Sequence, residues 1–545
     1  MNRDLALGKL KTESFDICII GGGASGAGCA LDAVLRGYKV ALIDEQDFAS
    51  QTSSRSTKLI HGGVRYLEQA FKKLDFGQLK QVRHGLQERH IVLSLAPHLA
   101  RPLPLLTPVG SWIEGLYFTI GLKLYDQFAA KDSLPKSRWL NKKEVLEKMP
   151  TLNRSKLHSA VLYYDGQLDD ARYCLAMVRA AAQAGAVVAN YIGLQDFDKD
   201  DKGKITGLLI ADSLTGERSG INSKLVINCT GPYADRVRLL ANTQLTPRMR
   251  PSKGVHISLP AATLKSNHAL LIPKTSDGRV VFAIPFEGGT MLGTTDTEYQ
   301  ALEEEPCLTK EEKMYLADTL NPYLEKPIAL DDIKAGFGGL RPLLNGDGAK
   351  STKSLVRDHE VEVEPVSGLI SLLGGKWTTY RLMAKDTIDE VDRLMGEFRP
   401  CTTETHILTG GVGYRYDLWK QVSARYGLDT EMSQHLLSKY GSLAMEVAEL
   451  TLINSEWKHR IHKDYPYCAA EVIYGVRKEM VLTLRDFLAR RTRLEIMDWD
   501  ACLLAIPYVA DLMASELNWT EQQKNTNVEE YSSLLENYKI QAGVI

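Results

Sequence analysis

Apolar runs and helical stretches alternate over the first fifty residues of the chain. Residues 15–20 form an apolar run that predicts a buried strand, residues 27–35 have the composition of a helix, and residues 38–43 predict a second strand. A strand, a helix and a strand in close succession are typical of a parallel α/β unit. A helix through residue 184 followed by a strand at 186–191 repeats this pattern, so we expect a discontinuous α/β domain.

Two later regions have different patterns. Residues 254–259, 279–286 and 290–296 alternate apolar with polar positions and are rich in β-branched residues, which predicts an antiparallel sheet. Residues 369–374 again form a strand that runs into glycines and a helix. Beyond Pro400 the pattern is helical.

Three glycines separate the first predicted strand from the first predicted helix. Gly21, Gly23 and Gly26 fit G-x-G-x-x-G, in which the first glycine allows the turn, the second lets the backbone approach a pyrophosphate, and the third lets the helix pack on the strand. Asp44 ends the second strand about twenty residues later, where a carboxylate accepts hydrogen bonds from an adenosine ribose. The motif alone also fits an ordinary turn, but its position predicts a dinucleotide site.

Composition excludes several classes of protein. The chain has 545 residues, too many for one core, with 66 basic and 68 acidic residues, so nothing indicates the basic face of a nucleic-acid-binding protein. Its 8 cysteines are scattered without C-x-x-C, which indicates no metal site and a reducing compartment. The first residues do not resemble a signal peptide, and we find no apolar run of about eighteen residues, so we expect no membrane span.

A polar loop follows Asp44 and carries the most specific segment of the chain. Residues 58–68, KLIHGGVRYLE, resemble the FAD-dependent glycerol-3-phosphate dehydrogenases, and further segments at 253–256, 293–296, 339–342 and 357–358 are similar to the same family in the same order. The similarity extends from about residue 14 to about residue 515. Two positions depart from it, since Arg55 stands where some relatives have a small residue and Trp377 where leucine is frequent.

The resemblance implies an α/β fold with three parts. These are a discontinuous Rossmann domain of the glutathione-reductase type that binds FAD, a substrate domain built on an antiparallel sheet, and a C-terminal all-α cap. We assign 14–95, 150–246 and 365–398 to the FAD domain, 96–149 and 247–364 to the substrate domain, 399–520 to the cap and 521–545 to a polar tail. The predicted FAD contacts are Gly21, Gly23, Gly26, Asp44, Thr52, Ser53, Ser54, Thr57, Gly63, Thr230, Gly231, Gly375 and Thr378.

Oxidation of an alcohol by a flavin needs anion anchors, a proton acceptor and positive charge near the flavin. Taken singly, each candidate cation also fits a solvated charge or a structural ion pair. The resemblance implies that five residues face the substrate: Arg65, Tyr66, Arg341, Arg357 and Lys376. Of the candidates we assign Arg341 and Lys376 to catalysis, and Arg65, Tyr66 and Arg357 to substrate binding.

His256 is the candidate base, because an imidazole titrates near neutral pH and can take a hydroxyl proton as hydride leaves. A histidine between Val255 and Ile257 also fits an ordinary strand residue, and an arginine could instead stabilise an alkoxide. We interpret His61 as part of the loop structure beside the flavin and Asp296 as a group that orients the site.

Residues 112–128 are apolar with aromatic edges, and basic residues at 131, 136 and 138 follow them. This pattern fits a core helix or a helix in a membrane interface. The resemblance favours the interface, because bacterial relatives are peripheral membrane enzymes that pass electrons to quinone.

The sequence therefore predicts oxidation of sn-glycerol 3-phosphate to dihydroxyacetone phosphate, with FAD reduced and reoxidised by a membrane quinone. We expect a cytoplasmic protein attached peripherally to the inner face of the cytoplasmic membrane, with a homodimer as a further expectation. The alternatives are an oxidase that uses oxygen, an amine or amino-acid oxidase, and a non-enzymatic flavin-binding protein. Two distant glycine turns around one cofactor disfavour an NAD enzyme.

Overall fold

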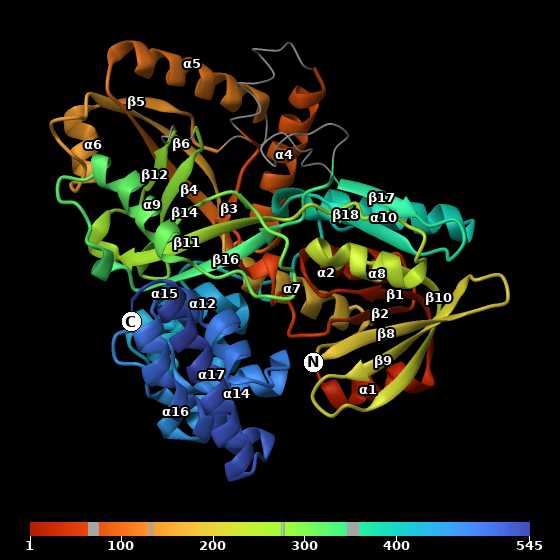
Figure 1. Cartoon of the computed structure of the whole chain (residues 1–545). Coiled ribbons are helices and arrows are strands. Elements are labelled where there is room, and N and C mark those ends of the chain that lie inside the picture. The colour runs from red at the N-terminus through yellow and green to blue at the C-terminus, as the bar shows by residue number, and fades with distance from the viewer. Residues whose placement is uncertain (64–75, 130–133, 274, 276–277, 346–358, 545) are drawn as a thin grey trace.

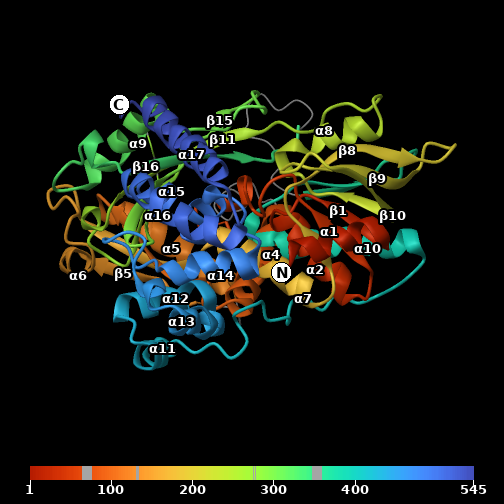
Figure 2. The same cartoon turned by 90° about the horizontal axis from the view of Figure 1, so that it is seen from below.

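The computed structural model describes residues 1–63, 76–129, 134–273, 275, 278–345 and 359–544 (Figure 1). Two sheets lie beside each other, and a group of C-terminal helices packs below the second sheet in the view of Figure 1. The view from below shows these helices against both the first and the second sheet (Figure 2). The predicted α/β fold with a helical C-terminal region is confirmed.

The first sheet carries the glycine turn. Its central strand β1 (Ser14–Ile20) pairs in parallel with β2 (Val40–Ile43) on one side and with β10 (Arg218–Asn228) on the other. The sheet continues through β7 (Val187–Ala189), β18 (Ile370–Gly374), β17 (His359–Val363), β9 (Ile205–Asp212) and β8 (Ile192–Lys199). The helices of this part are α1 (Arg3–Thr12), α2 (Ala24–Leu35), α7 (Asp170–Gln183), α8 (Ala234–Ala241) and α10 (Tyr380–Met395).

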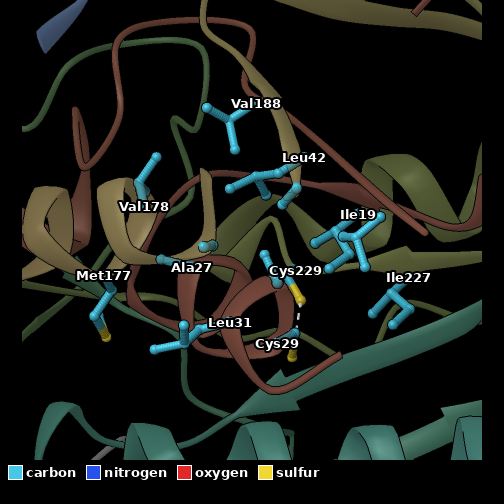
Figure 3. Close-up of a cluster of buried hydrophobic side chains, with 14 of the residues drawn as sticks. Ile19, Ala27, Cys29, Leu31, Leu42, Met177, Val178, Val188, Ile227 and Cys229 are labelled. Carbon is cyan, nitrogen blue, oxygen red and sulfur yellow. Dashed lines mark hydrogen bonds between the residues drawn. The ribbon is translucent and has the colours of Figure 1, made fainter. Parts of the chain in front are cut away.

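The core of this region surrounds helix α2, whose small residues allow close packing. Ala27 and Cys29 are fully buried, and Leu31 lies beside them (Figure 3). Residues from β1, β2, β7, β10 and α7 complete the cluster in Figure 3. Because one helix packs against several strands, the start of α2 is fixed relative to the ends of those strands.

The second sheet is antiparallel in all but one of its described strand pairs. The exception is β12 (Ala269–Ile272), which runs parallel to β4 (Ala100–Val109), so this sheet is mixed where the sequence predicted an antiparallel one. Its other strands are β3 (Leu59–Ile60), β5 (Arg138–Asn141), β6 (Ser159–Leu168), β11 (Ser252–Pro260), β13 (Val281–Phe286), β14 (Gly289–Gly293), β15 (Thr297–Glu298) and β16 (Ala335–Arg341). Its helices are α5 (Trp112–Ala129), α6 (Lys142–Lys148) and α9 (Lys310–Leu320), while α4 (Phe76–Leu95) contacts both regions.

Strand pairing divides the chain differently from the predicted boundaries in three places. Strand β3 pairs with β6 in the second sheet, although we assigned 14–95 to the FAD domain. Strand β6 pairs with β4 in the second sheet, although we assigned 150–246 to the FAD domain. Strand β17 pairs with β18 in the first sheet, although we assigned 247–364 to the substrate domain. β3 and β6 join the second sheet through partners distant in sequence, which local patterns do not reveal, whereas β17 forms a hairpin with the next strand, β18.

The C-terminal region is helical, as predicted, and continues to the end of the described chain. Helix α17 (Glu521–Gln541) buries Tyr531, Leu535 and Tyr538, so residues predicted as a polar tail form part of the packed structure. The other helices are α11 (Trp419–Tyr426), α12 (Thr430–Tyr440), α13 (Ala444–Ile453), α14 (Ala469–Glu479), α15 (Leu494–Met497) and α16 (Trp499–Leu517), with a π-helical turn at Asp486–Arg491.

Candidate functional site

A cavity opens at the carboxyl ends of β1, β2 and β10, where ligands bind in open α/β sheets. It encloses about 1100 Å³ of empty space, including its open mouth. Seven of the predicted cofactor residues line it: Gly21, Gly23, Asp44, Thr52, Ser53, Thr230 and Gly231. The remaining six, Gly26, Ser54, Thr57, Gly63, Gly375 and Thr378, lie outside its lining.

The glycine turn leaves no space for side chains. Gly21 has a φ of 103°, and a Cβ atom there would lie 2.7 Å from the carbonyl oxygen of Cys229. A Cβ atom on Gly26 would lie 1.8 Å from the carbonyl oxygen of Gly21, although Gly26 does not line the cavity. The close backbone packing places the N-terminus of α2 at the cavity, where its N–H groups fit a pyrophosphate.

Ser53 and Asp44 complete this end of the cavity. The Ser53 hydroxyl accepts a hydrogen bond of 2.8 Å from the Ala24 N–H in the first turn of α2. Asp44 accepts hydrogen bonds from the N–H groups of Gly22, at 2.6 Å, and Gln46, at 2.9 Å. Burial raises the pKa of the Asp44 carboxyl to about 7, so this group titrates near neutral pH. These observations fit the adenosine and diphosphate portion of FAD.

A second glycine turn follows β18 and lies next to the loop that carries Ser53. Gly374 lines the cavity, and Gly374 and Gly375 have φ angles of 74° and 94°. The Trp377 indole N–H donates to the Ser53 carbonyl at 3.0 Å, and the His61 N–H donates to Thr378 Oγ1 at 3.4 Å. Trp377, one of the two departures from the family pattern, therefore joins the second glycine turn to the loop that carries Ser53.

The hydroxyls of the loop between β2 and β3 point in different directions. Thr52 donates to the Leu340 carbonyl at 2.8 Å, and Ser54 is buried and donates to the Gln51 carbonyl at 3.3 Å. Thr57 lies 3.0 Å from Nε2 of His256. The prediction treated these hydroxyls alike, but the structure turns Ser54 inward and Thr57 toward the second sheet.

His256 lies in the middle of β11 and is 2% exposed. Its ring stacks on Phe337 with centroids 4.9 Å apart, and Nδ1 has no hydrogen-bond partner among the described residues. A Cβ atom on Gly293 would lie 2.1 Å from the ring, so the glycine on β14 makes room for the imidazole. Burial, with Lys58 and Arg341 nearby, holds the pKa of His256 well below its usual value. The imidazole is therefore neutral at pH 7.

Arg341 ends β16, opposite Ser252 on β11. Its guanidinium donates to Thr294 Oγ1 at 3.0 Å and to the Thr295 carbonyl at 2.8 Å, and it lies 3.5 Å from Asp296. The structure thus brings Arg341 and Asp296 together at one end of the sheet. Lys376 is half-buried beside the second glycine turn.

Three predicted substrate residues, Arg65, Tyr66 and Arg357, lie outside the described residues. Arg55, the other departure from the family pattern, is buried and pairs with Glu305. It also donates to the Gly338 carbonyl at 3.3 Å. Arg55 therefore connects the loop to the second sheet.

Some features of the site had no signal in the sequence. Ile192 and Leu194 on β8, together with Val237 and Leu240 on α8, give the cavity an apolar side. Their apolar spacing indicates only buried positions, so a ligand role could not be inferred from it. Within the described ranges, no group of three or more metal-ligating side chains occurs.

Helix α5 exposes large apolar side chains on one face. Trp112 and Ile113 are 63% and 74% exposed, and Leu116, Tyr117 and Ile120 follow on the same face. On the opposite face Tyr125 is buried, and a Cβ atom on Gly115 would lie 2.1 Å from the Trp139 ring. No helix among the described residues is both long and apolar enough to cross a bilayer.

Comparisons with known proteins agree with this geometry. Residues 16–381 match the family described as FAD dependent oxidoreductase, and residues 401–524 match the C-terminal domain of alpha-glycerophosphate oxidase. The mitochondrial glycerol-3-phosphate dehydrogenase of Homo sapiens is 41% identical over 530 residues, covering 95% of this chain and 72% of that protein. The corresponding Bos taurus protein gives the same values.

Solved structures are similar as well. The glycerol-3-phosphate dehydrogenase from Bacillus halodurans, complexed with FAD, superimposes with a TM-score of 0.80 and is 32% identical, covering 99% of this chain and 97% of that chain. The L-α-glycerophosphate oxidase from Mycoplasma pneumoniae has a TM-score of 0.55 and 18% identity over 72% of this chain and 97% of that chain, which shows the fold alone.

Proposed function

Because this chain belongs to the family of FAD-dependent glycerol-3-phosphate dehydrogenases, we propose that it oxidises sn-glycerol 3-phosphate to dihydroxyacetone phosphate and passes the electrons to a membrane quinone. FAD is the cofactor. The observation that carries the proposal is the pairing of Thr57, on the loop that wraps the cavity, with His256 on the second sheet. This contact joins a buried neutral base to the loop that lines the cavity.

The residues present fit FAD, which when bound accepts a hydride from the carbon that bears the hydroxyl. The N-terminus of α2 and the turn at Gly21 would hold the diphosphate, and Asp44 would accept hydrogen bonds from the ribose. The turn at Gly374 and Gly375 would hold another portion of the cofactor. We assign Thr52, Ser53, Thr230 and Gly231 to the same wall.

His256 accepts the proton of the substrate C2 hydroxyl. When Nε2 donates its hydrogen to Thr57, the partnerless Nδ1 presents a lone pair as the acceptor. The lowered pKa of His256 keeps the imidazole neutral at pH 7, so its lone pair is available, although the same shift weakens it as a base.

Cationic groups hold the substrate phosphate and stabilise an alkoxide at C2. Arg341 is fixed by Thr294 and Thr295, so its planar guanidinium is already oriented. Lys376 adds a compact charge beside the second glycine turn. By family resemblance, Arg65, Tyr66 and Arg357 complete the anchor.

Helix α5 supports peripheral attachment to the membrane that carries the quinone. Its exposed aromatic and aliphatic face suits the headgroup region, where aromatic side chains concentrate. Exposed basic residues at 123, 136 and 138 lie near it and can contact anionic lipids. The inner face of the cytoplasmic membrane stays the proposed location, and the names of several relatives place those proteins in mitochondria.

Substitution of the exposed face tests the attachment. Replacing Ile113 and Ile120 with serine leaves the buried face of α5 intact, so we expect the variant to keep its activity with a soluble dye acceptor. We expect it to lose co-sedimentation with anionic lipid vesicles. Leu504, 71% exposed on α16, provides the control, and Leu504→Ser should sediment like the parent. Equal sedimentation of all three proteins would contradict the role of α5.

An oxidase is the second candidate, since residues 401–524 match a domain named for alpha-glycerophosphate oxidase. The two functions differ in the electron acceptor. We expect purified protein with sn-glycerol 3-phosphate to reduce a short-chain quinone rapidly and to consume oxygen slowly. Rapid oxygen consumption without quinone would favour the oxidase. The homodimer stays a prediction, which sedimentation equilibrium of the purified protein tests.

A further inference from the structure

The C-terminal region contacts the loop beside the cavity through the segment between α14 and α15. This segment includes the π-helical turn Asp486–Arg491, a rare geometry that frequently occurs at functional sites. Arg490 and Arg491 from this turn both donate to Asp47, at 2.6 and 2.7 Å. Asp47 is fully buried and lies three residues after Asp44, so the C-terminal region contacts the beginning of the loop that wraps the cavity.

Arg493, just beyond the turn, contacts the middle of the same loop. It is 1% exposed and has a left-handed φ of 74°, which is unfavourable for a residue with a side chain. Its Nη2 donates to the Ser54 carbonyl at 2.6 Å and to Asp170 Oδ1 at 2.9 Å. Nη1 donates to the Ala489 carbonyl at 3.1 Å. One guanidinium therefore links the C-terminal region to the loop.

Asp170, the carboxylate that Arg493 contacts, also binds residues of the loop. Its second oxygen accepts from Lys58 Nζ at 2.7 Å, and from the hydroxyl and N–H of Ser56 at 2.7 and 3.0 Å. Lys58 is fully buried and donates to the Ser54 carbonyl as well, at 2.7 Å. Burial lowers the pKa of Lys58 to about 7, and the ion pair with Asp170 opposes this shift.

The loop that these contacts hold carries residues of both walls of the site. Ser53 contacts the N-terminus of α2, and Thr57 contacts His256. A shift of the segment from residue 53 to residue 57 would therefore move the diphosphate site and the base relative to each other. Small displacements of reacting groups reduce turnover strongly even when binding persists.

We propose that Arg493 is a positioning residue for the oxidation, acting through Asp170 and the Ser54 carbonyl on the loop 53–57. The inference rests on the proposed function, because it assigns Arg493 to the base and cofactor of that reaction. Arg493 touches neither cavity nor substrate, so its effect is on the geometry between Ser53 and Thr57. If Arg493 only stabilised the fold, its substitution would have no specific effect on the geometry between Ser53 and Thr57.

The test compares Arg493→Lys with Arg477→Met in the FAD-loaded protein. Lysine keeps the charge but lacks the planar fork that reaches three oxygens at once. Arg477, on α14, pairs with Glu516 at 2.6 Å near the surface and provides the matched control. For Arg493→Lys we expect kcat to fall about tenfold to a hundredfold with an unchanged KM. The peptide containing 52–58 should exchange its amide hydrogens faster in both the FAD-loaded and the FAD-free protein. The control should match the parent in each measurement.

A second variant approaches the same contact from the loop. Ser56→Ala removes a hydroxyl that donates to Asp170 and accepts from the Lys58 N–H, at 3.0 Å, with little change in volume. We expect a smaller fall in kcat and the same faster exchange. If the Arg493→Lys protein does not fold, the measurements on Ser56→Ala test the proposal instead. Variants that fold with parental kcat and parental exchange at 52–58 would overturn the proposal. A parent that does not oxidise sn-glycerol 3-phosphate would instead overturn the proposed function.

Discussion

The two sides of the proposed site, called here its first and second walls, differ in the atoms that form them. The wall from the first sheet is made of backbone, with glycines whose substitution would bring a Cβ atom to 1.8 Å or 2.7 Å from a carbonyl oxygen. The second wall is made of side chains on the second sheet, His256 and Arg341, which are held by hydrogen bonds to Thr57 and Thr294 and do not line the cavity itself. Changes in the first wall should therefore affect cofactor binding, and changes in the second should affect turnover with cofactor bound.

The largest effect is expected from Gly26→Ala. The new Cβ atom would meet backbone, which cannot rotate away as a side chain can, so the turn and α2 must separate. We expect the purified protein to contain no flavin, measured by the ratio of absorbance at the flavin band to that of the protein. Gly8 in α1 has nothing within 4 Å of a Cβ atom, and Gly8→Ala should keep its flavin. A full flavin content in Gly26→Ala would contradict the role of the first wall.

His256→Asn tests the role of the second wall. Loss of the base should lower kcat about 10²- to 10⁴-fold, because a positioned general base contributes that much, while flavin content stays parental. Rapid-mixing measurement of flavin reduction by sn-glycerol 3-phosphate provides the rate. His268→Asn, at a half-buried histidine near β12, serves as the control. An unchanged reduction rate in His256→Asn would remove His256 from the mechanism.

Arg341→Ala should have a smaller effect on the same wall. Hydrogen bonds to charged groups contribute about 1.5–3 kcal/mol, so we expect kcat/KM to fall about tenfold to a hundredfold with FAD retained. Arg250 on the neighbouring segment pairs with Glu298 at the surface, and Arg250→Ala should stay close to the parent because exposed pairs contribute little. Loss of FAD from Arg341→Ala would place this residue in the first wall instead.

The smallest expected effect is the change of FAD affinity with pH. Because the pKa of Asp44 is raised to about 7, the carboxylate that accepts ribose hydrogen bonds is lost as pH falls below 7. FAD affinity should therefore weaken by at most about tenfold per pH unit below 7, measured by fluorescence titration of the FAD-free protein. Asp44→Asn should abolish this dependence. A wild-type affinity that does not change between pH 6 and pH 8 would contradict the assignment.

The free energy of unfolding of the FAD-free protein should change with pH in the direction opposite to that of the FAD affinity. The unfolded carboxyl ionises near its ordinary pKa of about 3.9, and the folded one near 7, so the folded state binds more protons between these values. The contribution of Asp44 is therefore present at low pH and is lost as pH rises through 7. Denaturant unfolding of wild type and Asp44→Asn separates this contribution from those of other groups.

The difference between the walls also explains what the sequence could predict. The glycine turn is a local pattern, because strand, turn and helix are contiguous and the glycines are required by the backbone itself. The second glycine turn was predictable for the same reason. Local patterns did not indicate that β6 joins the second sheet, or that β12 runs parallel to β4, because those pairings connect distant segments.

Side-chain roles were harder to predict. The positions of His256 and Arg341 came from resemblance, since a histidine between two apolar residues equally fits an ordinary strand. Arg493 had no signal, because its partner Asp170 is 323 residues away in sequence. Helix α17 is an exception, since Tyr531, Leu535 and Tyr538 have the spacing of one helix face, and this pattern was present in the predicted tail.

Anaerobic titration of the purified protein with sn-glycerol 3-phosphate tests the central claim most directly. We expect the visible spectrum to show bound FAD, and we expect the substrate to bleach it in the absence of any other electron acceptor. Amino acids added in its place should leave the spectrum unchanged. Protein without flavin absorbance, or flavin that sn-glycerol 3-phosphate does not bleach, would contradict the account.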